Sequence, residues 1–436
     1  MMEDRGWSLV SLRPRSSIFY LQRIYTTMAT IALLGTMDTK GTEYAFLSEQ
    51  IQKRGHHTLV IDTGTLGEPR LKPDISRAEV ASAGGADFAA LVAKRDRGEA
   101  VTSMSQGASV VLSRLVAARQ VDGVIALGGS GGTAIATAAM RALAIGFPKV
   151  MVSILASGNT APYVDVKDIV MFPSIVDIAG LNRISRVLLS RAAGAICGMV
   201  EVHIDAGADK PVIVASQFGN TTPCVDRARS ILEAAGYEVV VFAAVGTGGR
   251  TMESLIASGM VGAVLDITTT EWADELVGGV LTAGPQRLEA AARHGVPEIV
   301  STGCLDMVNF GSPETVPTKF QGRRFYQHNP QVTLMRTTPQ ENHELGCILA
   351  RKLNLSTGPV TVLLPLRGNS LIGTSGQPFH DPEADQALFD ALRSNLRTDI
   401  PVVELDNAIN DQPFAEACSL ELMKNLAVAS SRSHGA

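Results

Sequence analysis

The chain has 436 residues, a length that favours two domains of roughly 200 residues each over a single core. A hydrophobic content of 45%, 41 glycines and 19% charged residues are typical of a soluble α/β protein with buried parallel sheet and many tight turns. The net charge of −5 argues against nucleic acid as a partner, and the lack of a long uncharged apolar run argues against a membrane-spanning helix. The five cysteines form no CxxC pair, so they predict no zinc site and fit a reducing compartment such as the cytoplasm.

Residues 1–27 differ in composition from the rest of the chain. Arginines alternate there with apolar and hydroxyl residues, and Glu3 and Asp4 are the only acids. Such a segment could be a mitochondrial transit peptide, although its two acids count against that hypothesis, or it could be a dispensable disordered extension. Folded structure is expected from residue 28 onward.

The first predicted unit is a buried strand, Thr30–Leu34, a polar turn, Gly35–Gly41, and an amphipathic helix, Thr42–Arg54. A second strand, His57–Asp62, follows. The charged stretch Glu68–Gly107 is predicted to be a helical excursion at the surface, with most of its charges in solvent.

The side chains of the first turn suit a nucleotide. Lys40 could pair with a phosphate, Asp38 could hold a magnesium ion, and Thr36 and Thr39 could donate hydrogen bonds to oxygens. The alternative is that Thr39 or Thr42 only caps the helix while Lys40 lies in solvent.

A second turn, rich in glycine, follows the buried strand Val124–Leu127 and precedes a predicted helix, Thr133–Ala144. It consists of Gly128, Gly129, Ser130, Gly131, Gly132 and Thr133. Small residues let backbone N–H groups approach an anion, and a helix amino-terminus favours negative charge, so this turn predicts a phosphate site. An ordinary strand-to-helix turn is the alternative. The turn is not a Walker loop, because no Lys-Ser or Lys-Thr closes it, and its glycine spacing disfavours a nicotinamide cofactor.

A third turn follows the next strand and carries Ser157, Gly158, Asn159 and Thr160, which suit recognition of hydroxyl or phosphate groups. Further along, Asp177 could hold a ribose or a metal-bound water, or it could cap the helix that runs to Arg191.

After a linker predicted at Glu201–Lys210, the same alternation of strands and helices starts again. The chain is therefore predicted to fold as two doubly wound Rossmann-like α/β domains with mostly parallel sheets, residues 28–205 and 206–436. The strands expected in the second domain are Pro211–Ala215, Glu238–Ala243, Gly262–Ile267, Glu298–Thr302, Gln331–Met335, Val360–Leu364 and Pro401–Leu405.

Two arginines of the second domain directly follow predicted parallel strands. Arg336 and Arg367 should then emerge together at the carboxyl edge of the sheet, with the hydroxyls of Thr337 and Ser370, and bind the anionic group of a substrate. Alternatively, each arginine pairs with a structural acid.

Several motifs in fixed order, among them LLGTMDTKG, ALGGSGGTAIATAAMRALAIGFPKVMVSILASGNT and FQGRRFYQHNPQVTLMRTT, give a resemblance to a known family. From about Thr30 to about Leu426 the chain resembles the ATP-binding family typified by the inhibitory domain of the tomato mosaic virus resistance protein. The resemblance implies two Rossmann-like domains, ATP with Mg²⁺ in the amino-terminal half, and a homodimer. Carried over by motif, the nucleotide site would use Gly35, Thr36, Asp38, Thr39 and Lys40, the glycine turn Gly128 to Thr133, and Ser157 to Thr160.

Two functional classes follow. The first is an ATP-dependent enzyme that acts on a small acidic metabolite held between the domains. The second is a non-catalytic nucleotide-binding protein that engages and inhibits or regulates a protein partner. Catalytic residues cannot be named from the sequence, because no arrangement of nucleophile and base is recognisable.

Overall fold

The computed structural model describes residues 28–202 and 210–434, which fall into two compact units. The extension 1–27, with its proposed transit peptide, and most of the linker predicted at Glu201–Lys210 lie outside the described residues.

The amino-terminal unit is built on a five-stranded parallel sheet in the order β2-β1-β3-β4-β5. Its strands are β1 Thr30–Gly35, β2 His57–Asp62, β3 Gly123–Gly128, β4 Lys149–Ser153 and β5 Val170–Pro173. The chain goes outward from β1 to β2 and then returns to the other side of β1 to form β3. The strand order therefore reverses between β1 and β3, the place where doubly wound sheets bind their ligands.

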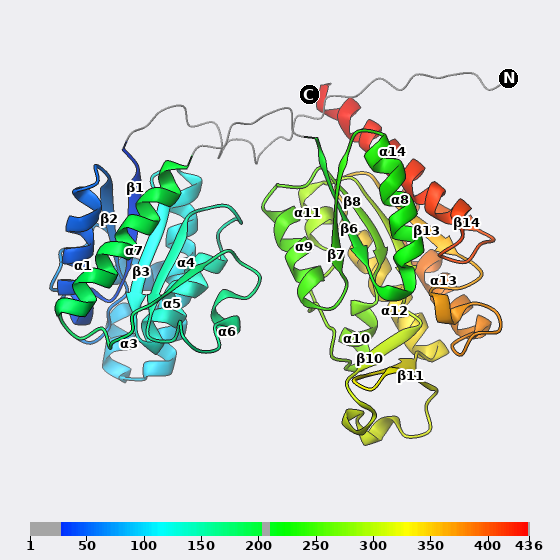
Figure 1. Ribbon diagram of the computed structural model, residues 1–436, viewed down its shortest axis with the longest axis horizontal. Coiled ribbons are helices and arrows are strands. Elements are labelled where there is room, and N and C mark those ends of the chain that lie inside the picture. Colours follow the sequence, from blue (N-terminus) through cyan, green and yellow to red (C-terminus); the bar gives the residue numbers. More distant parts are fainter. Residues whose placement is uncertain (1–27, 203–209, 435–436) are drawn as a thin grey trace. The chain divides into compact units, whose positions relative to one another are not determined.

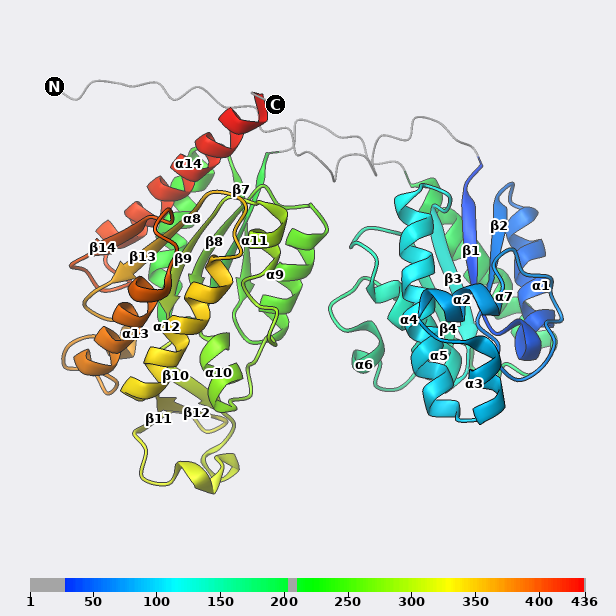
Figure 2. The same ribbon diagram turned by 180° about the vertical axis from the view of Figure 1, so that it is seen from behind.

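Helices cover both faces of this sheet (Figures 1 and 2). They are α1 Met37–Gln52, α2 Arg77–Ala83, α3 Phe88–Lys94, α4 Arg97–Ala117, α5 Ser130–Arg141, α6 Ala161–Val164 and α7 Arg183–Glu201. Alternate residues of β1 enter opposite cores: Ile31 and Leu33 pack with α1 and α7, whereas Ala32 and Leu34 pack with α4 and α5. This two-sided burial is why the central strands β1 and β3 are continuous apolar runs.

The carboxyl-terminal unit contains a six-stranded parallel sheet in the order β14-β13-β9-β8-β6-β7. Its strands are β6 Val212–Gln217, β7 Glu238–Ala243, β8 Ala263–Thr268, β9 Glu298–Gly303, β13 Val360–Pro365 and β14 Val402–Leu405. The order again reverses, here between β6 and β8. The prediction of two doubly wound α/β domains is confirmed.

Helices α8 and α14 cover one face of this sheet, and the core on the other face is formed with α9, α11, α12 and α13 (Figures 1 and 2). The helices are α8 Thr222–Ala234, α9 Thr247–Ala257, α10 Glu271–Val277, α11 Ala290–His294, α12 Pro339–Leu353, α13 Pro382–Asn395 and α14 Gln412–His434, with single 3₁₀ turns η2 Gly219–Thr221, η3 Pro313–Thr315, η4 Thr318–Phe320 and η5 Leu371–Gly373. Trp272 of α10 is buried in this core, and the Lys352 ammonium lies 5.1 Å from its ring centroid.

One predicted strand has different partners from those expected. The segment predicted as Gln331–Met335 forms β12, Val332–Arg336, which pairs antiparallel with β10, Met307–Phe310, and β11, Phe325–Asn329, in a separate three-stranded sheet. The prediction that it belongs to the parallel sheet was wrong. A short apolar run is the same in a parallel and an antiparallel strand, so the sequence could not distinguish the two.

Two predicted turns also belong partly to helices. Helix α1 begins at Met37 rather than Thr42, and α5 begins at Ser130 rather than Thr133. Gly41, predicted as the end of a turn, is a helical residue that lets Arg70 and Leu71 approach, since a Cβ at Gly41 would lie 2.9 Å from both. Gly41, a glycine placed for close packing, was thus interpreted as a turn residue.

Candidate functional site

The three predicted turns come together at one edge of the amino-terminal sheet. Strands β1, β3 and β4 are neighbours and run parallel, so the segments that follow them all leave the sheet at its carboxyl edge. The edge includes the point between β1 and β3 where the strand order reverses.

The side chain of Tyr44, from α1, lies between β1 and β3 at this point of reversal. Its hydroxyl donates to the carbonyl of Leu34 on β1 at 2.5 Å and accepts the N–H of Leu127 on β3 at 2.8 Å. The hydroxyl thus replaces a direct hydrogen bond between the strands, whose paired register ends at Leu34 and Ala126. Gly35 is required for this arrangement, because a Cβ there would lie 1.9 Å from the Tyr44 oxygen. Burial raises the pKa of Tyr44, so the phenol stays protonated.

The glycines of the second turn fall into two kinds. A Cβ at Gly128 would lie 3.0 Å from Gly132 Cα, so Gly128 is explained by close packing of strand against helix. At Gly129, Gly131 and Gly132 the nearest atoms to a Cβ would be at 3.6 to 3.7 Å, an ordinary contact, and none of the three has a positive φ. Neither packing nor backbone conformation explains these three glycines.

Helix α5 starts in this turn without a side-chain cap, because its N-cap residue is Gly129. An uncapped start leaves the first N–H groups of a helix for water or a ligand, and the helix dipole favours an anion there. The predicted contact residue Ser130 is exposed at this start. Thr133, in contrast, is fully buried, and its hydroxyl is bonded to that of Ser153, the last residue of β4, at 2.7 Å.

Arg97 is a cation at this edge that the sequence did not reveal. It is the first residue of α4, its side chain is exposed, and its Nη2 lies 3.6 Å from the Cβ position of Gly131. The sequence placed Arg97 in a charged cluster that was predicted to be solvated. The packing of α4 against α5 brings it to the glycines.

The residues of the first turn are bonded within the protein. Lys40 donates to the carbonyl of Ile178, in the loop after β5, and is not free in solvent. The hydroxyls of Thr36 and Thr39 bond each other at 2.8 Å. Asp38 is buried, and its Oδ2 accepts the N–H groups of Leu66 at 2.7 Å and Gly67 at 3.1 Å.

The third turn is the most open of the three. Ser157, Gly158 and Asn159 are exposed, and Asn159 accepts the N–H of Ala161 at 3.2 Å at the start of α6. Thr160 is the N-cap residue of α6 but makes no side-chain cap bond. These residues lie at the edge without forming a closed pocket around it.

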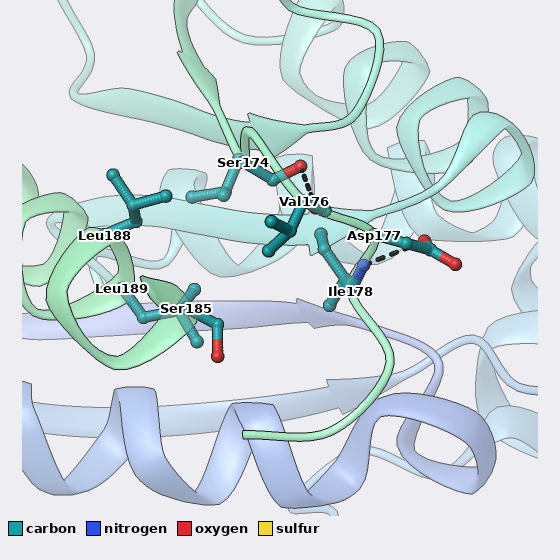
Figure 3. A pocket seen from close by; sticks show the side chains of 8 residues that line it. Ser174, Val176, Asp177, Ile178, Ser185, Leu188 and Leu189 are labelled. Carbon is teal, nitrogen blue, oxygen red and sulfur yellow. Dashed lines mark hydrogen bonds between the residues drawn. The ribbon is translucent and has the colours of Figure 1, made fainter. Parts of the chain in front are cut away.

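A small cavity lies one strand further along, between the loop after β5 and helix α7 (Figure 3). Its volume is ≈ 10 Å³, enough for about one water molecule, and most of its wall is apolar. Asp177 accepts the N–H of its neighbour Ile178 at 2.8 Å there, while α7 is capped by Asn182 with Ser185. Asp177 is therefore not the cap of this helix.

The predicted anion site of the second domain has a different geometry. Arg336 ends β12 of the antiparallel sheet and Arg367 follows β13 of the parallel sheet, so the two do not share a sheet edge. Arg336 is buried and bonds Asp385 at 2.7 Å, and Arg367 is exposed and bonds Asp406. Ser370 donates to Asp306 at 2.6 Å. The structure thus contains the alternative arrangement, in which each arginine pairs with a protein carboxylate.

A carboxylate of the protein also occupies the start of α9, after β7. Glu271 accepts the N–H groups of Gly246 at 2.7 Å and Gly249 at 3.1 Å, and it pairs with the buried Arg287 at 2.7 Å. Arg287 also bonds Asp266 and was not singled out from the sequence. An anion position at this edge is therefore filled from within the chain.

Comparison with models of known protein families shows which family the chain matches. A model of the amino-terminal domain of the uncharacterised protein family UPF0261 matches residues 29–205, and the model of its carboxyl-terminal domain matches residues 210–426. The chain belongs to this family. None of the helices described in residues 28–202 and 210–434 has the length and apolar character needed to cross a bilayer.

The family includes bacterial and plant relatives. A UPF0261 protein of Clostridium tetani is 50% identical over 395 residues, covering 90% of this chain and 98% of that protein. The ToMV resistance protein Tm-1(GCR237) and the ToMV susceptible protein tm-1(GCR26) of tomato are each 39% identical over 412 residues. The match covers 88% of this chain but 54% of each tomato protein. The resemblance found from the motifs is thereby confirmed.

Among solved structures, a putative UDP-N-acetylglucosamine 2-epimerase from Listeria monocytogenes is 11% identical, over 94% of this chain and 98% of that one, with a TM-score of 0.23. A Streptomyces glycosyltransferase in complex with thymidine diphosphate is 12% identical, over 94% of this chain and 100% of that one, with a TM-score of 0.19. Similarity at this level carries no argument about this chain.

Proposed function

We propose that the amino-terminal unit binds the phosphates of ATP, with Mg²⁺, at the edge where β1 and β3 diverge. The observation that carries the proposal is the set of glycines at the start of α5. Glycine inside a helix costs about 1 kcal/mol relative to alanine. Gly131 and Gly132 are helical, yet a Cβ would fit at both positions. Close approach of a phosphate to the backbone explains why these two positions are glycine, whereas packing does not explain it.

Charge and shape support the same site. Arg97 lies beside Gly131, and Lys40 stands in the first turn of α1, where its bond to the Ile178 carbonyl can be exchanged for one to a phosphate oxygen. The Tyr44 hydroxyl holds β1 and β3 apart at the same edge. The choice of ATP among phosphate ligands rests on the family resemblance drawn from the motifs.

Calorimetric titration of the full chain with magnesium ATP tests this proposal. Gly131→Asp should lower the affinity at least about 100-fold, because its carboxylate occupies the anion position. The fold should survive, since a Cβ at residue 131 meets no atom closer than 3.6 Å and an acid suits the first turn of a helix. Gly198→Ala is the matched control, because its Cβ would meet nothing within 4 Å. Equal ATP affinity in wild type and folded Gly131→Asp would contradict the proposal.

In the enzymatic form of the proposal, the bound ATP drives a reaction on a small acidic metabolite. The metabolite is not assigned to Arg336 and Arg367, because both are paired with protein carboxylates. Release of ADP or AMP, stimulated by one member of a library of small acids, is the expected result. Tight ATP binding without turnover under any addition would contradict an enzymatic role.

Binding of a protein partner is the second candidate function. Apolar side chains are exposed in the loop after the edge strand β5, where Ile175 is 71% exposed, and on helix α7, where Ile184 is 51% and Val187 47% exposed. Exposed apolar surface at a sheet edge favours protein contacts. The names of the tomato relatives, which refer to ToMV resistance and susceptibility, agree with a role of this kind. Two results together would distinguish this function. The chain binds nucleotide without turning it over, and Ile175→Asp abolishes the complex with the protein partner.

A further inference from the structure

Asp38 and Asp62 form a buried pair of carboxylates beside the first turn of α1. Asp38 is 4% exposed and Asp62 is fully buried at the end of β2. Among the residues that the structure describes, no lysine, arginine or histidine forms an ion pair with either. The nearby Arg77 is engaged elsewhere, with the carbonyl of Gly67 and with Glu68.

Each of the two carboxylates has one oxygen bonded and one oxygen without a partner. Asp62 Oδ1 accepts the N–H groups of Met37 at 2.9 Å and Gly64 at 2.8 Å, and Asp38 Oδ2 is held by the amides after β2. Asp38 Oδ1, Asp62 Oδ2 and the hydroxyl of Thr63 are buried and have no hydrogen-bond partner in the described part of the chain. Three buried oxygens from one small region are therefore unsatisfied.

These groups lie around one glycine. A Cβ at Gly64 would lie 2.6 Å from both Cγ and Oδ1 of Asp38, and the N–H of the same glycine donates to Asp62. The N–H of Thr63 donates to the carbonyl of Gly35 at 2.8 Å, which fixes Thr63 at the end of the neighbouring strand β1. The turn Asp62–Gly64 thus lies against both carboxylates, and Thr63, whose hydroxyl is buried and has no partner in the described part of the chain, is the central residue of that turn.

Buried charges without a partner are costly, so such a pair must gain either a proton or a cation. Two carboxylates carry a charge of −2, which a divalent cation balances, and carboxylate and hydroxyl oxygens are hard ligands of the kind that Mg²⁺ binds. Within the described residues no group of three or more His, Cys, Asp or Glu side chains could hold a metal. The site at Asp38 and Asp62 is smaller than such a group, because it has two carboxylates and a threonine hydroxyl.

We propose that Asp38, Asp62 and Thr63 bind a divalent cation of the Mg²⁺ type, and that they do so without nucleotide. The cation joins the start of α1 to the turn after β2 and so holds the β1 side of the sheet edge in place. Because no nucleotide takes part, the proposal does not depend on ATP binding at the glycines.

The test uses the full chain, freed of metal by chelation and kept free of nucleotide. Titration with Mg²⁺, and with Mn²⁺ as a paramagnetic probe, should show one saturable ion per chain and a rise in Tm. Asp62→Asn and Asp38→Asn should each lower the affinity for the ion at least about tenfold. Asparagine keeps one oxygen to accept the backbone N–H bonds, so both variants are expected to fold. Thr63→Val should lower the affinity for the ion by a smaller factor.

Asp74→Asn is the matched control. Asp74 also accepts a backbone N–H, from Val60 at 2.7 Å, but it is exposed, so its loss should leave the ion affinity unchanged. A wild-type chain whose Tm and spectra do not respond to Mg²⁺ or Mn²⁺ would overturn the proposal. So would unchanged ion binding in folded Asp38→Asn and Asp62→Asn. If Asp62→Asn raises Tm and the wild type ignores cations, the pair shares a proton instead and the proposal fails.

Discussion

Tyr44 shows how one side chain shapes the edge of the amino-terminal sheet. Its hydroxyl satisfies the N–H of Leu127 and the carbonyl of Leu34, both buried. Tyr44→Phe leaves both groups unpaired, and we expect the free energy of unfolding of this unit to fall by about 1–3 kcal/mol. ATP affinity should fall as well, because the hydroxyl no longer fixes the spacing of β1 and β3 at the edge that carries the site. Chemical denaturation and calorimetry measure the two effects, with Tyr163→Phe as control; no change in either would show that the hydroxyl has no such role.

Arg97 gives a second test at the same scale. Its guanidinium stands beside Gly131, so Arg97→Ala should weaken magnesium ATP about tenfold, and more at low salt than at high salt. Arg95→Ala removes a neighbouring exposed arginine and should have little effect. Equal losses in both variants would mean that only the overall charge of this surface matters.

Asp274 makes the carboxyl-terminal unit sensitive to pH. Burial raises the pKa of Asp274 to about 7, against the opposing bonds from Asn309. Because the folded pKa lies above the ordinary value of 3.8, this group's stabilising effect is complete below about pH 4 and is lost as pH rises through about 7.

The carboxyl-terminal unit should therefore lose on the order of 2–4 kcal/mol of stability to this group between pH 4 and 8. Asp274→Asn should remove that dependence, and its new amide can donate to Asn309 Oδ1, which has no partner among the described residues. Denaturation of both proteins across this pH range measures the difference. Parallel curves would show that Asp274 titrates normally.

These side chains also show where sequence reasoning fails. Arg97 lies in a run of charges that is typical of a solvated surface, and only the packing of α4 against α5 gives it a role. Tyr44 fits the apolar face of α1, so no local signal marks its hydroxyl. The glycine turn after β3, in contrast, was visible in the sequence, because unneeded glycines are conspicuous in composition.

At the level of secondary structure, apolar runs predicted central strands such as β1 and β3, because strands covered on two faces are continuously apolar. The partners of the strands and the first residues of the helices were harder to predict from the sequence. Antiparallel β12 carries the same apolar pattern as a parallel strand, and α5 begins inside a glycine-rich segment that composition alone predicts to be a turn.

The ion pair at the end of β12 provides the test for this element. Arg336 joins the antiparallel sheet to α13 by its bond to Asp385, and it also donates to the carbonyl of Phe379 at 2.7 Å. Arg336→Met leaves a buried carboxylate unpaired and should cost about 3–5 kcal/mol of stability, which Asp385→Leu in the same chain should partly restore. Unchanged stability in Arg336→Met would instead favour the original prediction that this arginine binds a substrate anion.

At the scale of the whole chain, each unit has its own hydrophobic core on both faces of its own sheet. We therefore expect residues 28–205 and 206–436, expressed separately, each to unfold in one cooperative transition. Calorimetry of the two fragments measures this, and a fragment without a transition would show that it needs the other to fold. The predicted homodimer is a separate question, which sedimentation of the full chain answers.

The position of Trp272 provides an optical handle. The chain has two tryptophans, and the other, Trp7, precedes the described residues. In a chain that starts at residue 28, tryptophan emission would come from the carboxyl-terminal unit alone, whereas Tyr44 and Tyr163 are the tyrosines of the amino-terminal unit. The indole is buried beside Glu271, which holds the start of α9, and under the Lys352 ammonium. A shift in the wavelength of the Trp272 emission would therefore report a structural change around α10 in the carboxyl-terminal unit.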